Sequence, residues 1–291
     1  MIIDAHAHLW KKQNGIVNGK PVFSTGGGKS SFGGEIRQMM PPYMLNGENT
    51  AEMLVSNMDY AGVSGAVITQ EQIDGSQDEY LLSVKKRYPE RIKVCSLYEE
   101  GKPIVADGFD GIKICAGRLK EQDLTGHTTV FGTADAKGKF ISIDLAGGDA
   151  QVASMHEVIR HFPSLKIAIG HFGMVTRNGW QEQIRLAQNP HVYIESGGIT
   201  WLFHNEFYPY PSAVRAINEA AEICGFNKLM WGSDYPRTMT AITYKMSLDF
   251  IEKSNEIKLA DKALLVGKNA KMFYDFGDLQ IPVRVKNMVE D

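Results

Sequence analysis

The first eight residues, Met1-Ile2-Ile3-Asp4-Ala5-His6-Ala7-His8, form a short apolar run that ends in two histidines. We predict a buried strand here, and seven further β-rich runs follow it at residues 65–70, 92–98, 111–115, 140–145, 166–171, 192–196 and 228–234. Apolar residues at helical spacing separate most of these runs, at residues 50–61, 78–88, 150–161, 180–187, 211–224, 241–252 and 259–273. Eight strands alternating with helices over about 250 residues predict an α/β protein, a (β/α)8 TIM barrel.

A doubly wound open sheet is the alternative architecture. It would need no eighth strand, and no dinucleotide-binding glycine pattern follows the first strand. The sequence has neither an internal repeat nor a linker between two domains. We therefore expect residues 1–291 to form a single domain.

Two connections interrupt the strand–helix repeat, at residues 11–47 and 117–139. In a barrel both would lie at the C-terminal ends of the strands, where active sites lie. The first is rich in glycine and serine, and we predict that it is a lid or a binding loop. It contains Gly28-Lys29-Ser30, which resembles the end of a phosphate-binding loop, but Phe23 occupies the position of the first required glycine. A flexible loop is the simpler prediction.

Composition excludes several classes of protein. The chain is 43% hydrophobic and 22% charged, with a net charge of -3 and no basic stripe, so we expect a globular protein without a nucleic-acid partner. No apolar run approaches the ~18 residues that span a bilayer, and the first residues lack the features of a signal peptide. Three widely spaced cysteines do not form a disulfide framework, so a reducing cytoplasm is expected. Homo-oligomerisation stays open.

Three of the predicted strands end in residues that commonly bind metals. His6 and His8 are two apart on the first strand and therefore face the same side. His171 ends the sixth strand and Asp234 ends the eighth, which would lie beside the first in a closed barrel. Two imidazoles and a carboxylate suit a divalent metal, and a carboxylate there can also accept a proton from water. Any of these residues taken alone could be a buried structural group; together they predict a metal site.

Three motifs give the chain a resemblance to a known family: Asp-Ala-His-Ala-His at 4–8, Gly-His-Phe-Gly at 170–173 and Gly-Ser-Asp-Tyr-Pro at 232–236. They resemble the amidohydrolase superfamily, in particular its amidohydrolase-2 branch, and residues 267–273 resemble the closing helix of that branch. The resemblance implies a barrel with its site at the strand C-termini. It implies that His6, His8 and Asp234 line the centre, and that His171 is a ligand or a catalytic electrophile.

The fifth predicted strand departs from the pattern of many members, because it has Asp144 and no histidine. Asp144 is then an oxygen ligand, an orienting group or only the residue that opens a turn. Lys113 could serve a paired-metal centre, but the second histidine is missing, so we expect one divalent ion at most, zinc being the first choice. A fifth strand with an aspartate in place of the histidine resembles that of the lactonases of sugar acids and pyrone dicarboxylates. Some of those enzymes work without metal, so a metal-free mechanism stays open.

Further polar residues follow the predicted strands. We expect a small anionic substrate to be bound by residues from this set: Tyr98, Lys113, Arg118, Asp144, Glu195, His204 and Arg237. Lysine and arginine suit a substrate carboxylate. Solvated surface cations are the alternative for Lys113 and Arg118, and a packed surface histidine is the alternative for His204.

The favoured function is hydrolysis of a lactone C–O bond by a metal-activated water, with Asp234 taking the proton. The alternative is a metal-dependent decarboxylase of an unsaturated or aromatic acid, which would use the same residues. A non-catalytic barrel that binds a sugar acid or a partner is the third hypothesis.

Overall fold

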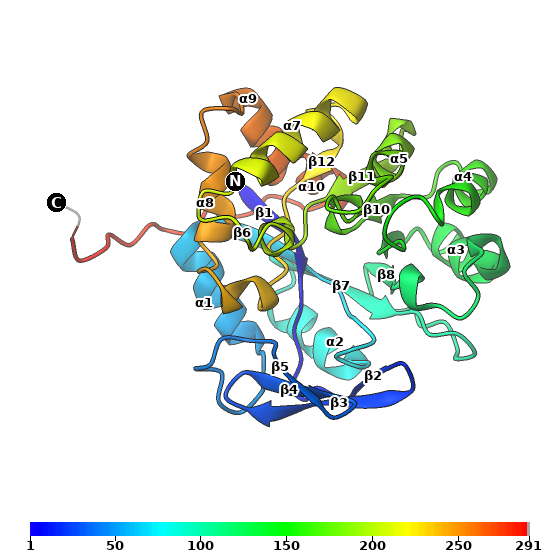
Figure 1. The fold of residues 1–291 in the computed structure, drawn as a ribbon, viewed down its shortest axis with the longest axis horizontal. Coiled ribbons are helices and arrows are strands. Elements are labelled where there is room, and N and C mark those ends of the chain that lie inside the picture. Colours follow the sequence, from blue (N-terminus) through cyan, green and yellow to red (C-terminus); the bar gives the residue numbers. More distant parts are fainter. Residues whose placement is uncertain (290–291) are drawn as a thin grey trace.

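The computed structural model describes residues 1–289, and its centre is one sheet of eight parallel strands (Figure 1). Neighbours in the sheet follow the order β1-β6-β7-β8-β9-β10-β11-β12. The strands are β1 (Ile2–Ala7), β6 (Val63–Ile68), β7 (Ile92–Leu97), β8 (Gly111–Ile114), β9 (Phe140–Ile143), β10 (Ile167–Ile169), β11 (Val192–Glu195) and β12 (Leu229–Met230). Nearly every residue in them is buried, as expected for parallel strands covered on both faces.

The segment after β12 brings the sheet back to β1. The Ala5 amide donates to the Trp231 carbonyl and the Asp234 amide donates to the His6 carbonyl, both at 2.9 Å. Ala7 and Tyr235 form a parallel bridge. The sheet is therefore a nearly closed (β/α)8 barrel, and the predicted fold class is confirmed.

The helices surround the barrel. They are α1 (Ala51–Ala61), α2 (Asp78–Arg87), α3 (Thr128–Ala136), α4 (Val152–His161), α5 (Trp180–Arg185), α6 (Ile199–Leu202), α7 (Pro211–Cys224), α8 (Met246–Glu252), α9 (Leu259–Ala263) and α10 (Asn269–Phe273). A π-helical turn at Leu264–Lys268 interrupts the predicted helix 259–273, and α3 lies in the predicted polar connection 117–139. Within residues 1–289, none of these helices has the length and apolar character to cross a membrane.

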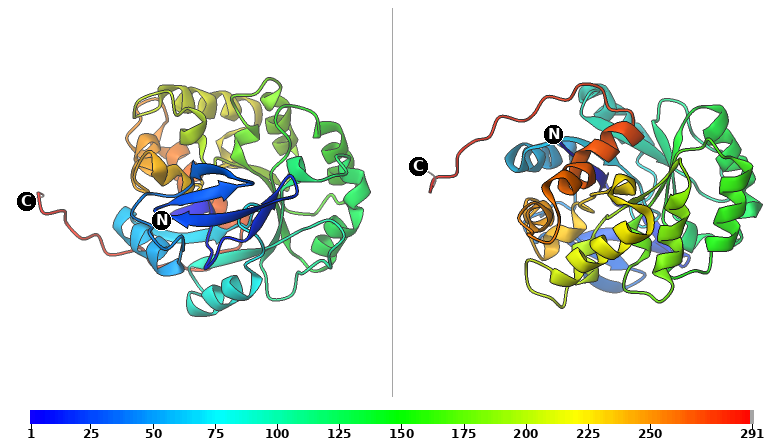
Figure 2. Two further views of the ribbon diagram at one scale, coloured as in Figure 1. Left: turned by 60° about the horizontal axis from the view of Figure 1, so that its bottom comes forward. Right: turned by 90° about the horizontal axis from the view of Figure 1, so that it is seen from above.

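Residues 11–47 contain a small antiparallel sheet where we expected a loop. Its strands, in spatial order, are β2 (Gly15–Val17), β3 (Lys20–Gly26), β4 (Lys29–Phe32) and β5 (Glu35–Gln38). We call this the cap sheet, and Figure 2 shows it in front of the barrel in the left view. The expected loop at 28–30 is wrong for Lys29 and Ser30, which begin β4. The many glycines hid the strand pattern, because Gly26, Gly27 and Gly28 form the turn with positive φ angles of 85°, 60° and 72°.

Strand β1 changes register between Asp4 and Ala7. Asp4 pairs with Ala66 and Ala7 pairs with Ile68, so β1 has one extra residue, a β-bulge. The bulge changes which face each residue occupies, because Ala5 packs inside the barrel whereas Ala7 packs under the helices. His6 and His8 consequently both point to the centre.

Apolar side chains fill the barrel interior at the N-terminal end of the strands. This interior plug consists of Ile3, Ala5, Val67, Cys95, Phe140, Ala168, Tyr193 and Met230, closed from below by Ala270, Phe273, Tyr274 and Phe276. The plug is close-packed: a Cβ on Gly111 would lie 2.3 Å from the Phe140 ring. A solid lower interior leaves only the opposite end of the barrel for a site.

Candidate active site

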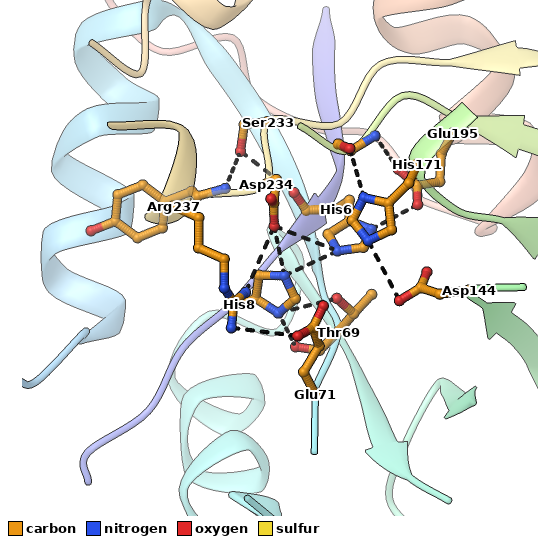
Figure 3. A network of polar contacts seen from close by, with 12 residues as sticks. His6, His8, Thr69, Glu71, Asp144, His171, Glu195, Ser233, Asp234 and Arg237 are labelled. Carbon is orange, nitrogen blue, oxygen red and sulfur yellow. Dashed lines mark hydrogen bonds and ion pairs between the residues drawn. The ribbon is translucent and has the colours of Figure 1, made fainter. Parts of the chain in front are cut away.

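Three histidines converge at the C-terminal ends of β1 and β10 (Figure 3). Each uses Nδ1 to donate to an oxygen that can only accept. The pairs are His6 to Glu195 Oε1 at 2.7 Å, His8 to the Thr69 carbonyl at 3.2 Å and His171 to the Gly197 carbonyl at 2.7 Å. With Nδ1 protonated, a neutral imidazole carries its lone pair on Nε2, so the three rings present Nε2 to the centre.

The Nε2 atoms of His6 and His8 lie 3.0 Å apart, and Asp234 Oδ1 lies 2.9 Å from His8 Nε2 and 3.9 Å from His6 Nε2. Two facing lone pairs at this distance repel each other unless a proton or a cation lies between them. In a tetrahedral site, zinc–nitrogen distances of about 2.0–2.1 Å place two ligand nitrogens about 3.3 Å apart, close to the separation of the two Nε2 atoms. The donor set of His6, His8 and Asp234 therefore fits a divalent metal ion.

A second group of possible ligands shares His6 and adds Asp144 and His171. The Asp144 carboxylate lies 3.5 Å from His171 Nε2 and 2.6 Å from Lys113 Nζ, and Lys113 is fully buried. Burial would raise the pKa of Asp144, but the charges of Lys113 and His171 hold it well below the usual value. Burial would lower the pKa of His171, but Asp144 raises it to about 10.

Asp234 stands in a strained turn that several hydrogen bonds hold. Its φ angle is 55°, in the left-handed region, and its Oδ2 accepts from Trp201 Nε1 at 2.6 Å. The preceding Ser233 donates from its amide and its hydroxyl to the Asp4 carboxylate, at 2.8 and 2.5 Å. Tyr244 also donates to Asp4. Burial would raise the pKa of Asp234, but His8 and Arg237 lower it below the usual value.

A cavity of about 750 Å³ opens over these residues. Asp144, His171 and Asp234 line it from the barrel, whereas His6 and His8 are fully buried. The cap sheet and the residue after it supply part of the cavity wall, through Phe32, Arg37, Gln38 and Met39. A small organic acid fits this volume.

The remaining predicted substrate-binding residues lie at different depths. Arg118 is exposed and lines the cavity, and no partner is found for its guanidinium among residues 1–289. Glu195 is fully buried behind His6 and does not line the cavity. Tyr98 pairs with His127 at 3.0 Å, and His204 is exposed and contacts the Trp201 carbonyl at 2.9 Å. The structure does not bring Tyr98 or His204 to the cavity.

Sequence reasoning missed several residues of the site. Trp201 lies in the short helix α6, and Thr69 and Glu71 lie at the end of the predicted strand 65–70 and just after it. Nothing in their local sequence marks them, because their contacts depend on the closed barrel. Asp4 carried a usable signal, since it is a charged residue inside a buried strand and therefore needs hydrogen-bond partners.

A family model described as amidohydrolase matches residues 3–276. The chain belongs to the amidohydrolase family. This amidohydrolase is an enzyme of that family, and the resemblance of its three motifs is confirmed. A search of curated proteins found no significant match.

Solved structures with the same fold include three from bacteria. A probable 2-pyrone-4,6-dicarboxylic acid hydrolase from Acinetobacter baumannii, with citric acid bound, is 18% identical with a TM-score of 0.70, over 94% of this chain and 99% of that one. An amidohydrolase from Burkholderia multivorans with bound zinc is 15% identical, with a TM-score of 0.69, over 95% and 100%. A 5-carboxyvanillate decarboxylase from Novosphingobium aromaticivorans, complexed with manganese and 4-hydroxy-3-methoxy-5-nitrobenzoic acid, is 16% identical, with a TM-score of 0.55, over 77% and 80%. At these identities the likeness concerns the fold.

Proposed function

We propose that this amidohydrolase is a metal-dependent hydrolase that opens a lactone ring in a small carboxylate or sugar acid. One observation carries the proposal: the Nε2 atoms of His6 and His8 lie 3.0 Å apart and 2.9 to 3.9 Å from the Asp234 carboxylate, at the base of a cavity of about 750 Å³. The fold of the pyrone-dicarboxylic acid hydrolase supports the choice of a lactone over an amide.

His6, His8 and Asp234 would hold one divalent ion, with His171 as a further ligand, and zinc is the proposed metal because imidazole nitrogens suit it. When bound, such an ion polarises a carbonyl and lowers the pKa of water toward about 7. Glu195 and the carbonyls of Thr69 and Gly197 keep the three rings in the tautomer that leaves Nε2 free.

Asp234 accepts the proton of the attacking water and returns it to the ring oxygen as the C–O bond breaks. Its pKa, held low by His8 and Arg237 against the effect of burial, keeps the carboxylate ionised at neutral pH. Trp201 Nε1 restrains Oδ2, which leaves Oδ1 on the side of the histidines.

Arg118 anchors a carboxylate of the substrate. It lines the cavity without a partner in the described chain, so it can bind a carboxylate through two parallel hydrogen bonds. Lys113 Nζ forms an ion pair with Asp144 Oδ1 at 2.6 Å and adds positive charge beneath the cavity. The bound citric acid of the Acinetobacter protein supports an anionic ligand.

To test the proposal, the purified protein is assayed with a panel of sugar-acid and dicarboxylate lactones. A pH indicator records acid release before and after treatment of the protein with a metal chelator. We expect acid release that chelation abolishes and zinc restores. His6→Ala should lose both the metal and the activity, whereas His156→Ala, an exposed histidine of α4, should keep both. Carbon dioxide release from an aromatic or unsaturated acid, without lactone opening, would replace the proposal with decarboxylation.

A further inference from the structure

A chain of buried polar contacts runs from the cap sheet to the centre of the barrel. Ser30 of β4 donates its hydroxyl to Gln13 Oε1 at 2.6 Å, and Gln13 Nε2 donates to Asp74 Oδ1 at 3.1 Å. The other oxygen of Asp74 accepts from Arg237 Nη2 at 2.6 Å. Ser30, Gln13 and Asp74 are each at most 2% exposed. Such a buried chain has little freedom to rearrange, because every broken hydrogen bond leaves an unpaired polar group.

Arg237 is the last member of this chain before the catalytic carboxylate. Its Nη1 lies 3.7 Å from Asp234 Oδ1, and its Nη2 lies 3.7 Å from a Glu71 oxygen (Figure 3). The Trp10 ring lies 5.8 Å from the guanidinium carbon. Three neighbours and Asp74 therefore fix where the guanidinium lies.

The guanidinium and the His8 ring approach the same oxygen from different directions. Asp234 Oδ1 is 2.9 Å from His8 Nε2, and Oδ2 is held by Trp201. Nε and Nη1 of Arg237 are buried without a hydrogen-bond partner among residues 1–289. Because these two groups have no hydrogen bond to hold them, the distance of the guanidinium from Asp234 Oδ1 depends on the hydrogen bond from Nη2 to Asp74.

We propose that Gln13 and Ser30 are positioning residues for the catalytic carboxylate: through Asp74 they hold Arg237 where it fixes Oδ1 of Asp234 among the histidines. The proposal rests on the proposed function only for the role of Asp234. It makes the cap sheet part of the catalytic assembly as well as a wall of the cavity. It also gives Ser30 of the Gly28-Lys29-Ser30 stretch a use unrelated to phosphate.

Two serines of β4 provide a matched pair of variants. Ser30 is fully buried and takes part in the chain, whereas Ser31 occupies the neighbouring position and, among residues 1–289, its hydroxyl has a hydrogen bond only with the Gly34 amide. Ser30→Ala and Gln13→Leu break the chain at different points, and Ser31→Ala is the control. If Gln13→Leu does not fold, Ser30→Ala, which removes one hydroxyl, still tests the proposal.

The first measurement needs neither metal nor turnover. The indole N–H of Trp201 donates to Asp234 Oδ2, so its resonance in a ¹H–¹⁵N spectrum reports on that carboxylate, and Trp201→Phe assigns it among the four tryptophans. We expect Ser30→Ala and Gln13→Leu to move this resonance and Ser31→Ala to leave it in place. Folded variants with an unmoved Trp201 resonance would overturn the proposal.

The second measurement is zinc affinity by competition with a chromogenic chelator. Residues that support a metal ligand typically change affinity 10- to 100-fold, so we expect a loss of about tenfold in Ser30→Ala and Gln13→Leu. Equal affinity in Ser30→Ala, Ser31→Ala and the unaltered protein would contradict the proposal. If the unaltered protein binds no zinc, the proposed function fails, and the Trp201 resonance still decides the positioning role.

Discussion

The two ends of the barrel interior are built from the same strands and have opposite chemistry. The lower end is the interior plug, where Ile3, Val67, Phe140 and their neighbours exclude water. The upper end, one to four residues further along the same strands, holds the histidines with Asp234. A single strand of this barrel therefore stabilises the fold at its start and supplies polar site residues at its end.

Lys113 lies between these two layers, and like the residues of the upper layer it carries a charged side chain. It is fully buried, and its ammonium pairs with Asp144 at 2.6 Å. Burial would lower the pKa of Lys113, but the charge of Asp144 outweighs it and raises the pKa above the usual value. The charged layer therefore carries its own counterions, and mutations there should act mainly on function.

The largest expected effect comes from Asp234→Asn in the upper layer. Removing a general base costs about 10²–10⁴-fold in rate, and the amide keeps the size of the side chain. We expect kcat to fall by at least about a thousandfold while the far-ultraviolet circular dichroism spectrum is unchanged. Asp110→Asn, at the lower end of β8, is the matched control and should keep full activity. An active Asp234→Asn enzyme would remove Asp234 from the mechanism.

The reverse experiment is Phe140→Ala in the interior plug. Phe140 is buried against Tyr274 and Phe273, so truncation leaves a cavity and should lower the free energy of unfolding by about 3–5 kcal/mol. Urea unfolding measures the loss, and kcat at low temperature should be almost unchanged. A large fall in kcat in folded protein would show that the two layers are not independent.

Glu195→Gln tests the boundary between the layers more finely. Glu195 is fully buried and accepts from His6 Nδ1 at 2.7 Å, and the amide keeps the shape but removes the charge. Loss of such a partner costs about 10–100-fold in metal affinity. Zinc competition should detect this loss, and an unchanged affinity would make Glu195 a purely structural group.

The smallest effect is expected outside the barrel, at Asp249 of α8. Burial would raise its pKa, but Lys245 and Lys253, at 2.6 and 2.8 Å, hold it below the usual value. A carboxyl with a lowered folded pKa stabilises the protein above its unfolded pKa, and this stability is lost as the pH falls through the folded value. Asp249→Asn should cost less than about 1 kcal/mol at pH 7 and a smaller amount at about pH 3, measured by urea unfolding. An equal cost at both pH values would point to packing.

The sequence predicted the upper layer better than its supports. His6, His8, His171 and Asp234 follow apolar runs, so strand periodicity placed them at one end of the barrel. The residues that orient them could not be predicted, because the contacts of Thr69, just after β6, and of Trp201 in α6 depend on barrel closure. The cap sheet was missed for a different reason, since its strands are short, β3 and β4 are joined by a glycine turn, and a hydrogen bond to Gln13 takes the place of apolar packing at the buried Ser30.

The β-bulge in β1 lets one strand contribute side chains to both layers of the barrel interior. Without it, the alternation that places Ile3 and Ala5 inside the barrel would also place Ala7 inside and would turn His6 and His8 toward the surrounding helices. The extra residue resets the alternation between the two parts. A deletion of the extra residue would therefore take both histidines out of the site while the apolar base of the barrel kept its pattern.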